Sequence, residues 1–185
     1  MAVADRLDSS LVLDTLKAVG IDWRPPDVLQ FARDLENKVA SSVAVAYPEV
    51  REVIESLHKA GHAMYVATQA GEWNARGALE GAGLIDLVDG VFSGSSQRAF
   101  KNDLAYWREI PKAVHAPARE LALVDDRLDY LQAASSAGFG AILLEGGGRT
   151  VREKRPRFVF ASIPSLANLP PLLKPLSQRK TQRRS

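Results

Sequence analysis

The stretch Tyr47–Thr68 reads YPEVREVIESLHKAGHAMYVAT, and its change of hydrophobic period decides the fold class. Its first half repeats apolar residues at helical spacing: Val50, Val53, Ile54 and Leu57. Gly61 marks the end of this predicted helix. The next residues, His62–Ala67, form a short apolar run that predicts a buried strand, and Thr68 follows it directly. A helix that leads straight into a buried strand is typical of a parallel sheet covered by helices.

The rest of the chain continues this alternation. Helices are predicted at Ser10–Val19, from Pro25 and Pro26 onward, and at Glu72–Ala82, Asn102–Ile110 and Asp129–Ala137. Strands are predicted at Leu87–Phe92, Leu121–Val124, Ala141–Leu144 and Phe158–Phe160, with a loop at Ser93–Ser96. This order predicts an α/β fold, a three-layer Rossmann-like parallel sheet with a small helical cap near the N-terminus. We expect a remnant and cap in residues 1–47, the α/β core in 48–173 and a basic tail in 174–185.

The composition excludes several classes of protein. The chain has 185 residues, 46% of them hydrophobic and 25% charged, which suits one domain with a buried core. It has no cysteine, so disulfide scaffolds and thiolate metal sites are excluded. It has neither a long apolar run nor the pattern of a secretory signal, so we expect no membrane partner and a cytoplasmic location. Five bases and no acid lie between Lys174 and Ser185, but no aromatic residue is interleaved with them, so nucleic acid is not an expected partner.

Candidate functional residues follow two of the predicted strands. Thr68 and Gln69 come after the strand at His62–Ala67, and Asp125 and Asp126 come after the strand at Leu121–Val124. Lys101 lies between them in sequence, at the start of a predicted helix. In open parallel sheets the ligand site lies beyond the carboxyl ends of the strands. Lysine and hydroxyl groups bind phosphate oxygens and carboxylates hold Mg²⁺, so this set predicts a site for a phosphorylated ligand.

Each of these residues also has a structural interpretation. Thr68 can open a turn or cap the following helix, and Lys101 can be an ordinary surface lysine. Asp125 and Asp126 can be an N-cap and a first-turn acid that the helix dipole favours. The combination in this order is more specific than any single residue.

The order and spacing resemble the haloacid dehalogenase-like (HAD) hydrolase superfamily over nearly the whole chain. The stretch quoted first looks like the family's entry helix and second motif, which places its Ser/Thr at Thr68. RAFKNDLAYW matches the third motif and places its lysine at Lys101, although the common Lys-Pro is Lys-Asn here. LALVDDRLDYLQAASSAGF resembles a fourth motif with a double Asp at Asp125 and Asp126, and ASIPSLANLPPLL resembles the terminal segment.

The resemblance implies Mg²⁺-dependent hydrolysis of a phosphate monoester through an aspartyl-phosphate. Thr68 and Lys101 would be catalytic groups that hold the phosphoryl oxygens, Gln69 would join them in binding substrate, and Asp125 and Asp126 would hold Mg²⁺. The substrate would be a small phosphorylated metabolite. Neither its identity nor the oligomeric state follows from the sequence.

The chain departs from the family at the first motif, an apolar strand that ends in Asp-x-Asp-x-Thr. Matching the usual continuation to Leu7, Asp8 and Ser9 places the nucleophile at Met1 and the second acid at Val3. Neither side chain can attack phosphorus or transfer a proton, so the chain as written is expected to be inactive or nearly so. The alternatives are a non-catalytic HAD-like binding protein and an unrelated α/β domain that binds nucleic acid through its tail. Without the first-motif strand, two inner strands are expected to have unpaired edges.

Overall fold

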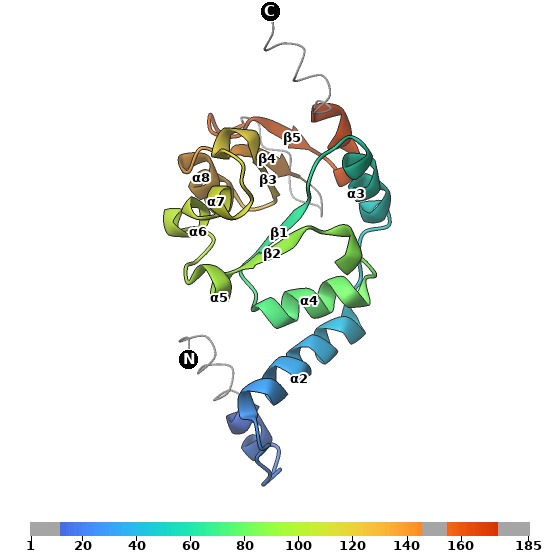
Figure 1. Cartoon of the computed structure of the whole chain (residues 1–185), viewed down its shortest axis with the longest axis vertical. Helices are drawn as coiled ribbons and strands as arrows, with labels where there is room; N and C mark the ends of the chain where they lie inside the picture. The colour runs from blue at the N-terminus through green and yellow to red at the C-terminus, as the bar shows by residue number, and fades with distance from the viewer. Residues whose placement is uncertain (1–11, 146–154, 174–185) are drawn as a thin grey trace, which may run out of the picture.

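The computed structural model describes residues 12–145 and 155–173, in which every strand belongs to a parallel pair (Figure 1). The strands are β1 (Tyr65–Thr68), β2 (Gly90–Ser93), β3 (Ala122–Asp125), β4 (Gly140–Leu144) and β5 (Ala161–Ile163). The helices are α2 (Val28–Val43), α3 (Val50–Lys59), α4 (Glu72–Gly81), α5 (Gly94–Gln97), α6 (Leu104–Arg108), α7 (Ile110–Ala113) and α8 (Leu128–Ser136), and residues 12–18 are also helical. Short 3-10 helices are η1 (Ile85–Leu87), η2 (Ala118–Glu120), η3 (Leu166–Asn168) and η4 (Pro170–Leu172). The predicted α/β fold is confirmed.

The helix boundaries follow from local chemistry in the sequence. α2 begins after Pro25 and Pro26, where the Asp27 carboxylate accepts a hydrogen bond from the Gln30 amide at 2.9 Å. α3 turns its apolar face inward and buries Leu57 to 1% exposure. The chain then leaves the helix through Gly61, whose φ of 86° lies in the left-handed region that glycine adopts without steric cost.

The strands of the described residues form two separate parallel sheets. β1 pairs with β2, and β3, β4 and β5 pair in that order, so the pair and the triplet are distinct in Figure 1. Thr68 at the end of β1 lies opposite Ser93, and Asp125 at the end of β3 lies opposite Leu143. Within residues 12–145 and 155–173, β1 and β3 each have a partner on one side only.

Two hydrophobic cores cover the two faces of the three-stranded sheet. Alternate residues of β4 belong to different cores, Ala141 and Leu143 to the first and Ile142 to the second. The first core is filled by α6 and α8, which contribute Tyr106, Trp107 and Leu131. The second is filled by α3, η3 and the residue that follows it, and it includes Leu57 and Leu169. Helices on both faces of the strands give the expected three layers.

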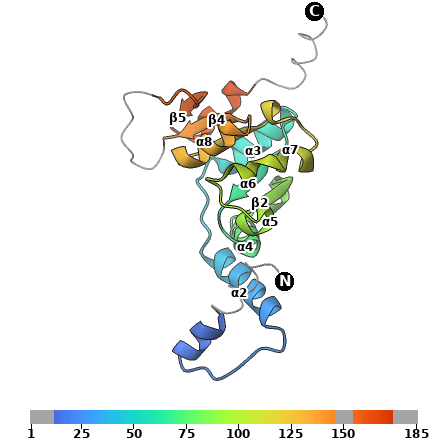
Figure 2. The same ribbon diagram turned by 90° about the vertical axis from the view of Figure 1, so that its left-hand side faces the viewer.

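The N-terminal helical part lies at one end of the molecule, beyond α4, in both views (Figures 1 and 2). α2 packs closely against α4 through two glycines one helical turn apart. A Cβ at Gly77 would lie 2.3 Å from the Asn37 carbonyl oxygen, and one at Gly81 would lie 2.1 Å from the Ser41 carbonyl oxygen. Only glycine lets the two backbones approach this closely, so the sequence Gly-x-x-x-Gly sets the distance between the helices.

Several predicted boundaries are wrong for local reasons. The strand predicted at Leu87–Phe92 begins only at Gly90, because Leu87 ends the 3-10 helix η1. The helix predicted at Asn102–Ile110 is divided into α6 and α7. The last strand lies at Ala161–Ile163, because a turn in which the Val159 amide bonds to the Pro156 carbonyl occupies most of the run Phe158–Phe160. The expected loop at Ser93–Ser96 contains helix α5, because Ser93 and Ser96 cap each other's backbone amides at 3.0 Å. β1 begins at Tyr65 and not at His62, because the Met64 amide donates its hydrogen bond to the Asp89 carboxylate, at 2.7 Å.

The remaining predictions concern a membrane-spanning segment, the location of the protein, the domain boundary and the basic tail. Among the described residues, no helix has both the length and the apolar character needed to cross a bilayer. The cytoplasmic location and the boundary at residue 47 stay predictions. The basic tail, 174–185, lies outside the described residues.

Candidate functional site

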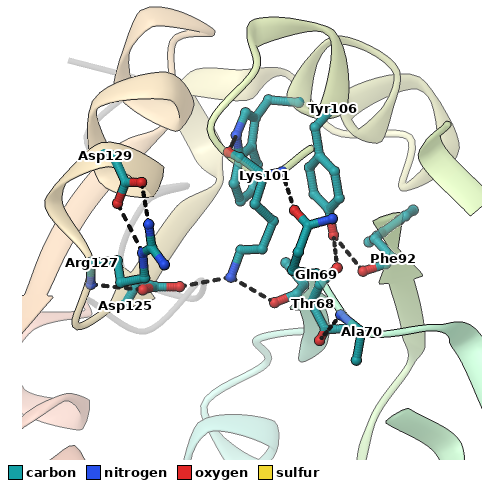
Figure 3. Close-up of polar contacts among 11 residues, drawn as sticks. Thr68, Gln69, Ala70, Phe92, Lys101, Tyr106, Asp125, Arg127 and Asp129 are labelled. Carbon is teal, nitrogen blue, oxygen red and sulfur yellow. Dashed lines mark hydrogen bonds and ion pairs between the residues drawn. The ribbon is translucent and has the colours of Figure 1, made fainter. Parts of the chain in front are cut away.

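The predicted site residues lie at the carboxyl ends of β1 and β3. Thr68 is the last residue of β1, Gln69 follows it, and Asp125 is the last residue of β3 (Figure 3). Lys101 comes from the loop between α5 and α6, and its side chain extends into the space between these two strand ends. The structure therefore brings together four residues that are separated by up to 57 positions in the sequence.

Two side chains hold the backbone of Lys101 in place. The Lys101 amide donates a hydrogen bond to Gln69 Oε1 at 2.7 Å, and the Lys101 carbonyl accepts one from Trp107 Nε1 at 2.8 Å. Trp107 is 1% exposed, so its indole is fixed in the first core. Because the backbone is held on both sides, the Lys101 side chain has a defined starting point toward β1 and β3.

The Lys101 ammonium group is buried and contacts both sheets. Its Nζ donates to the Ala67 carbonyl of β1 at 2.9 Å and to Asp125 Oδ2 of β3 at 2.7 Å. The side chains of Lys101 and Asp125 are only 6% and 11% exposed, so water screens this ion pair little. The ring of Tyr130 lies on another side of Nζ, 4.7 Å from ring centroid to nitrogen. The interpretation of Lys101 as an ordinary surface lysine is wrong.

The other predicted acid, Asp126, lies in an exposed turn next to Asp125. Asp125 Oδ1 accepts a hydrogen bond from the Arg127 amide at 2.8 Å, which fixes the carboxylate at the end of β3. The Arg127 guanidinium lies over Tyr130, 4.3 Å from the ring centroid, and pairs with Asp129 through Nε and Nη2. This hydrogen-bonded pair lowers the pKa of Asp129 and raises the pKa of Arg127 relative to their ordinary values.

The Thr68 hydroxyl group stabilises the turn after β1 and can also donate a hydrogen bond to a ligand. Its Oγ1 accepts a hydrogen bond from the Ala70 amide at 3.0 Å, so the hydroxyl opens the turn after β1 as the structural interpretation expects. That bond uses an oxygen lone pair and leaves the hydroxyl hydrogen available to donate.

The hydroxyl group of Tyr106 lies within hydrogen-bonding distance of the carbonyls of Thr68 and Phe92, at the ends of β1 and β2. Burial raises the pKa of Tyr106.

Gln69 supports the site in a way that the sequence did not indicate. Its Oε1 is used by the Lys101 amide, and its Nε2 lies so close to Gly94 that a Cβ there would be 2.6 Å away. The side chain thus spans from the end of β1 to the start of α5. A direct contact between Gln69 and substrate stays a prediction.

The two carboxylates at the end of β3 are about the smallest set of protein ligands with which Mg²⁺ is commonly bound. Asp125 and Asp126 offer hard carboxylate oxygens, and Mg²⁺ in proteins commonly takes one or two carboxylates together with water and substrate phosphate. Among the described residues, no group of three or more His, Asp or Glu side chains could hold a metal ion. Within the described residues, a magnesium ion here would thus have Asp125 and Asp126 as its carboxylate ligands, and water or a bound phosphate could complete the set.

Sequence reasoning missed the aromatic residues that support Lys101. The sequence patterns assign no role in the site to Tyr106, Trp107 or Tyr130. The adjacent pair Tyr106–Trp107, five and six positions after Lys101, is a signal that the sequence did carry.

The positions expected to hold the first motif are not described in full. Met1 and Val3 lie outside the described residues. Asp14 is exposed on the helix at residues 12–18. The described residues thus contain the Thr68, Lys101 and Asp125 side of the site.

Comparisons with known proteins agree with this architecture. A family model described as haloacid dehalogenase-like hydrolase matches residues 10–138, more than half of the chain. A phosphatase of Mycobacterium tuberculosis (strain CDC 1551) is 32% identical over 108 residues, which are 58% of this chain and 50% of the relative. A phosphoglycolate phosphatase of Pseudomonas fluorescens is 27% identical over 172 residues, which are 89% of this chain and 61% of the relative. The chain therefore spans between half and two thirds of the length of these curated relatives.

Solved structures show the same fold. The HAD phosphatase from Thermococcus onnurineus superposes with a TM-score of 0.65 at 20% identity, over 86% of this chain and 69% of that one. At this identity the likeness establishes the fold alone. Together with the match over residues 10–138, the comparisons show that the chain belongs to the haloacid dehalogenase-like hydrolase family.

Proposed function

We propose that this chain provides the phosphate-binding and Mg²⁺-binding side of a phosphomonoester hydrolase site. The observation that carries the proposal is the Lys101 ammonium group, buried where the carboxyl ends of β1 and β3 meet. A buried cation at this edge attracts an anion more strongly than a surface lysine does, because electrostatic attraction is stronger in a poorly solvated environment.

The roles of the site residues follow from their donors. Lys101 Nζ and the Thr68 hydroxyl would hold the phosphoryl oxygens, and Gln69 would keep Lys101 in position through its amide. Asp125 and Asp126 would hold Mg²⁺, which supplies positive charge to the phosphoryl group while negative charge develops on it. Arg127 stays next to this edge because Asp129 and Tyr130 hold its guanidinium group.

Hydrolysis through an aspartyl-phosphate also needs a carboxylate nucleophile. In the described part of the chain, the acids at this edge are Asp125 and Asp126, to which we assign the metal, so the nucleophile would come from outside the described residues. A second candidate function is therefore binding of a phosphorylated ligand without turnover. One observation favours it. Among the described residues, the carboxylate that pairs with Lys101 is Asp125, which we assign to the metal and not to nucleophilic attack.

The proposed ligand is a small phosphorylated metabolite. The relative from Pseudomonas fluorescens is named a phosphoglycolate phosphatase, which makes phosphoglycolate the first substrate to test. Inorganic phosphate is the matching probe for binding alone.

Calorimetric titration with inorganic phosphate in the presence of Mg²⁺ tests binding, and release of phosphate from p-nitrophenyl phosphate and phosphoglycolate tests turnover. We expect saturable phosphate binding that Lys101→Met weakens by at least about 10-fold, because a hydrogen bond to a charged group contributes about 1.5–3 kcal/mol. Lys112→Met removes an exposed lysine outside the site and serves as the control. Binding that Lys101→Met and Lys112→Met leave equally unchanged would refute the site. Binding without turnover would favour the second candidate function.

A further inference from the structure

Lys101 uses its donors on the protein itself. Of its three N–H groups, two reach the Ala67 carbonyl and Asp125 Oδ2, and the ring of Tyr130 lies against the ammonium group as well. Asp125 is equally engaged, with Oδ2 on Lys101 and Oδ1 on the Arg127 amide. In this arrangement the ammonium group and the carboxylate neutralise each other, and both ligands assigned above would have to enter an existing ion pair.

We propose that Lys101 and a divalent cation compete for the Asp125 carboxylate, so that cation binding transfers Lys101 from Asp125 to the phosphate. This inference rests on the proposed function, since it concerns the same site. It assigns Lys101 a second role, that of the internal cation that neutralises Asp125 when no metal ion is bound.

Electrostatics favours exchange over simultaneous binding. A divalent cation on Asp125 would lie close to the Lys101 ammonium group in a site where both side chains are about nine-tenths buried, so the two positive charges would repel strongly. Lys101 can leave Asp125 without losing its other contacts. The Gln69 and Trp107 hydrogen bonds hold its backbone, and the Ala67 carbonyl is a neutral partner that stays within reach. Movement is thus confined to the end of a flexible side chain.

The exchange couples the two ligands of the site. When Lys101 binds a phosphate dianion, it no longer competes with the metal for Asp125. When a metal binds Asp125, the Lys101 ammonium group is released and can donate to phosphate. Coupling of this kind is reciprocal, so each ligand should increase the affinity for the other by the same factor.

The test measures binding of a metal alone, with no phosphate and no substrate. Mg²⁺ is titrated calorimetrically and Mn²⁺ by paramagnetic resonance, into the wild-type chain, Lys101→Met and Lys112→Met. We expect Lys101→Met to bind the metal about 10-fold more tightly, within the range of 5- to 150-fold that is typical of coupled sites. Lys112→Met loses the same charge from an exposed pair with Glu109 and should bind like the wild type. Unchanged or weaker metal binding by Lys101→Met would overturn the proposal.

A measurement on the wild-type chain covers the case in which Lys101→Met does not fold. The ¹⁵N resonance of each lysine Nζ is detected through the non-exchanging Cε protons, so Lys101 and Lys112 can both be followed, and Lys112, which is 77% exposed, is the internal control. Saturating Mg²⁺ should shift or broaden the Lys101 signal without phosphate, and a Lys101 signal that Mg²⁺ leaves unchanged would overturn the exchange. Failure of phosphate binding with a positive metal result would refute the proposed function and leave the competition intact.

Discussion

The two sheets of this chain differ in how their strands are stabilised. In the three-stranded sheet, β4 is covered on both faces, and Ala141 and Ile142 are each 1% exposed. In the two-stranded sheet, Tyr65 is 37% exposed, and the other residues of β1 are only partly buried. Parallel strands are normally buried on both faces, so β1 and β2 depend more on polar contacts at their carboxyl ends. Those contacts come from Lys101 and Tyr106.

The comparison indicates that the candidate site stabilises the weaker sheet. Lys101 connects the Ala67 carbonyl in β1 to Asp125 in β3, and the hydroxyl of Tyr106 contacts the ends of both β1 and β2. Lys101 and Asp125, which would bind the ligands, are thus also the residues that connect the two sheets. Ligand binding and the stability of β1 and β2 should therefore be linked.

Loss of the buried cation should have the largest effect. Lys101→Met leaves Asp125 buried without its partner and the Ala67 carbonyl without its donor, so we expect the free energy of unfolding to fall by about 3–5 kcal/mol. Urea denaturation followed by circular dichroism measures this change. Lys112→Met, in an exposed ion pair, should have little effect, and equal effects of the two substitutions would contradict the role of burial.

Matched valine truncations should separate the two sheets. Val159, next to β5, is 2% exposed, so Val159→Ala should reduce the free energy of unfolding by about 2–3 kcal/mol. Val66 of β1 is only partly buried, so Val66→Ala should cost about 1 kcal/mol or less. Thermal and urea denaturation of both variants provide the comparison. A larger loss for Val66→Ala would mean that β1 is the better packed region.

The close contact between α2 and α4 predicts an intermediate effect. A methyl group at Gly77 would meet the Asn37 backbone, so Gly77→Ala should force the helices apart and cost about 1–2 kcal/mol despite the better helix propensity of alanine. Gly140→Ala is the control, since its Cβ would have its nearest neighbour at 3.6 Å, an ordinary contact. Faster hydrogen exchange in α2 of Gly77→Ala, and not of Gly140→Ala, is the expected result. Unchanged exchange would show that α2 tolerates the methyl group.

The smallest effect concerns the stability of the chain in alkaline solution. Burial raises the pKa of Tyr106, so the unfolded chain releases this proton near pH 10 while the folded chain retains it. The contribution of Tyr106 is therefore fully present below about pH 10 and is lost as the pH rises further, by about 1 kcal/mol near pH 11. Urea midpoints near pH 8 and pH 11 should fall less for Tyr106→Phe than for the wild type. Tyr65→Phe, at an exposed tyrosine, should follow the wild type.

The sequence predicted the fold and the residues that meet at the candidate site because both depend on local patterns. Apolar periodicity located α3 and β4, and the polar residues after two apolar runs located Thr68 and Asp125. The missed features depend on contacts between distant residues. The bond between Trp107 and the Lys101 carbonyl, and the stacking of Tyr130 on Lys101, require the folded arrangement of α6 and α8. The Phe158–Phe160 run was misplaced because a turn, which periodicity does not report, determines where pairing with β4 begins.

Hydrogen exchange with and without ligands tests most directly the central claim that the site lies across both sheets. Amide exchange is measured by mass spectrometry on the wild-type chain, alone and with inorganic phosphate and Mg²⁺. We expect β1 and β2 to exchange faster than β4 in the free chain, and the ligands to slow exchange selectively in β1, β2 and the segment around Lys101. Equal exchange in both sheets, or ligands that leave β1 and β2 unchanged, would contradict the account.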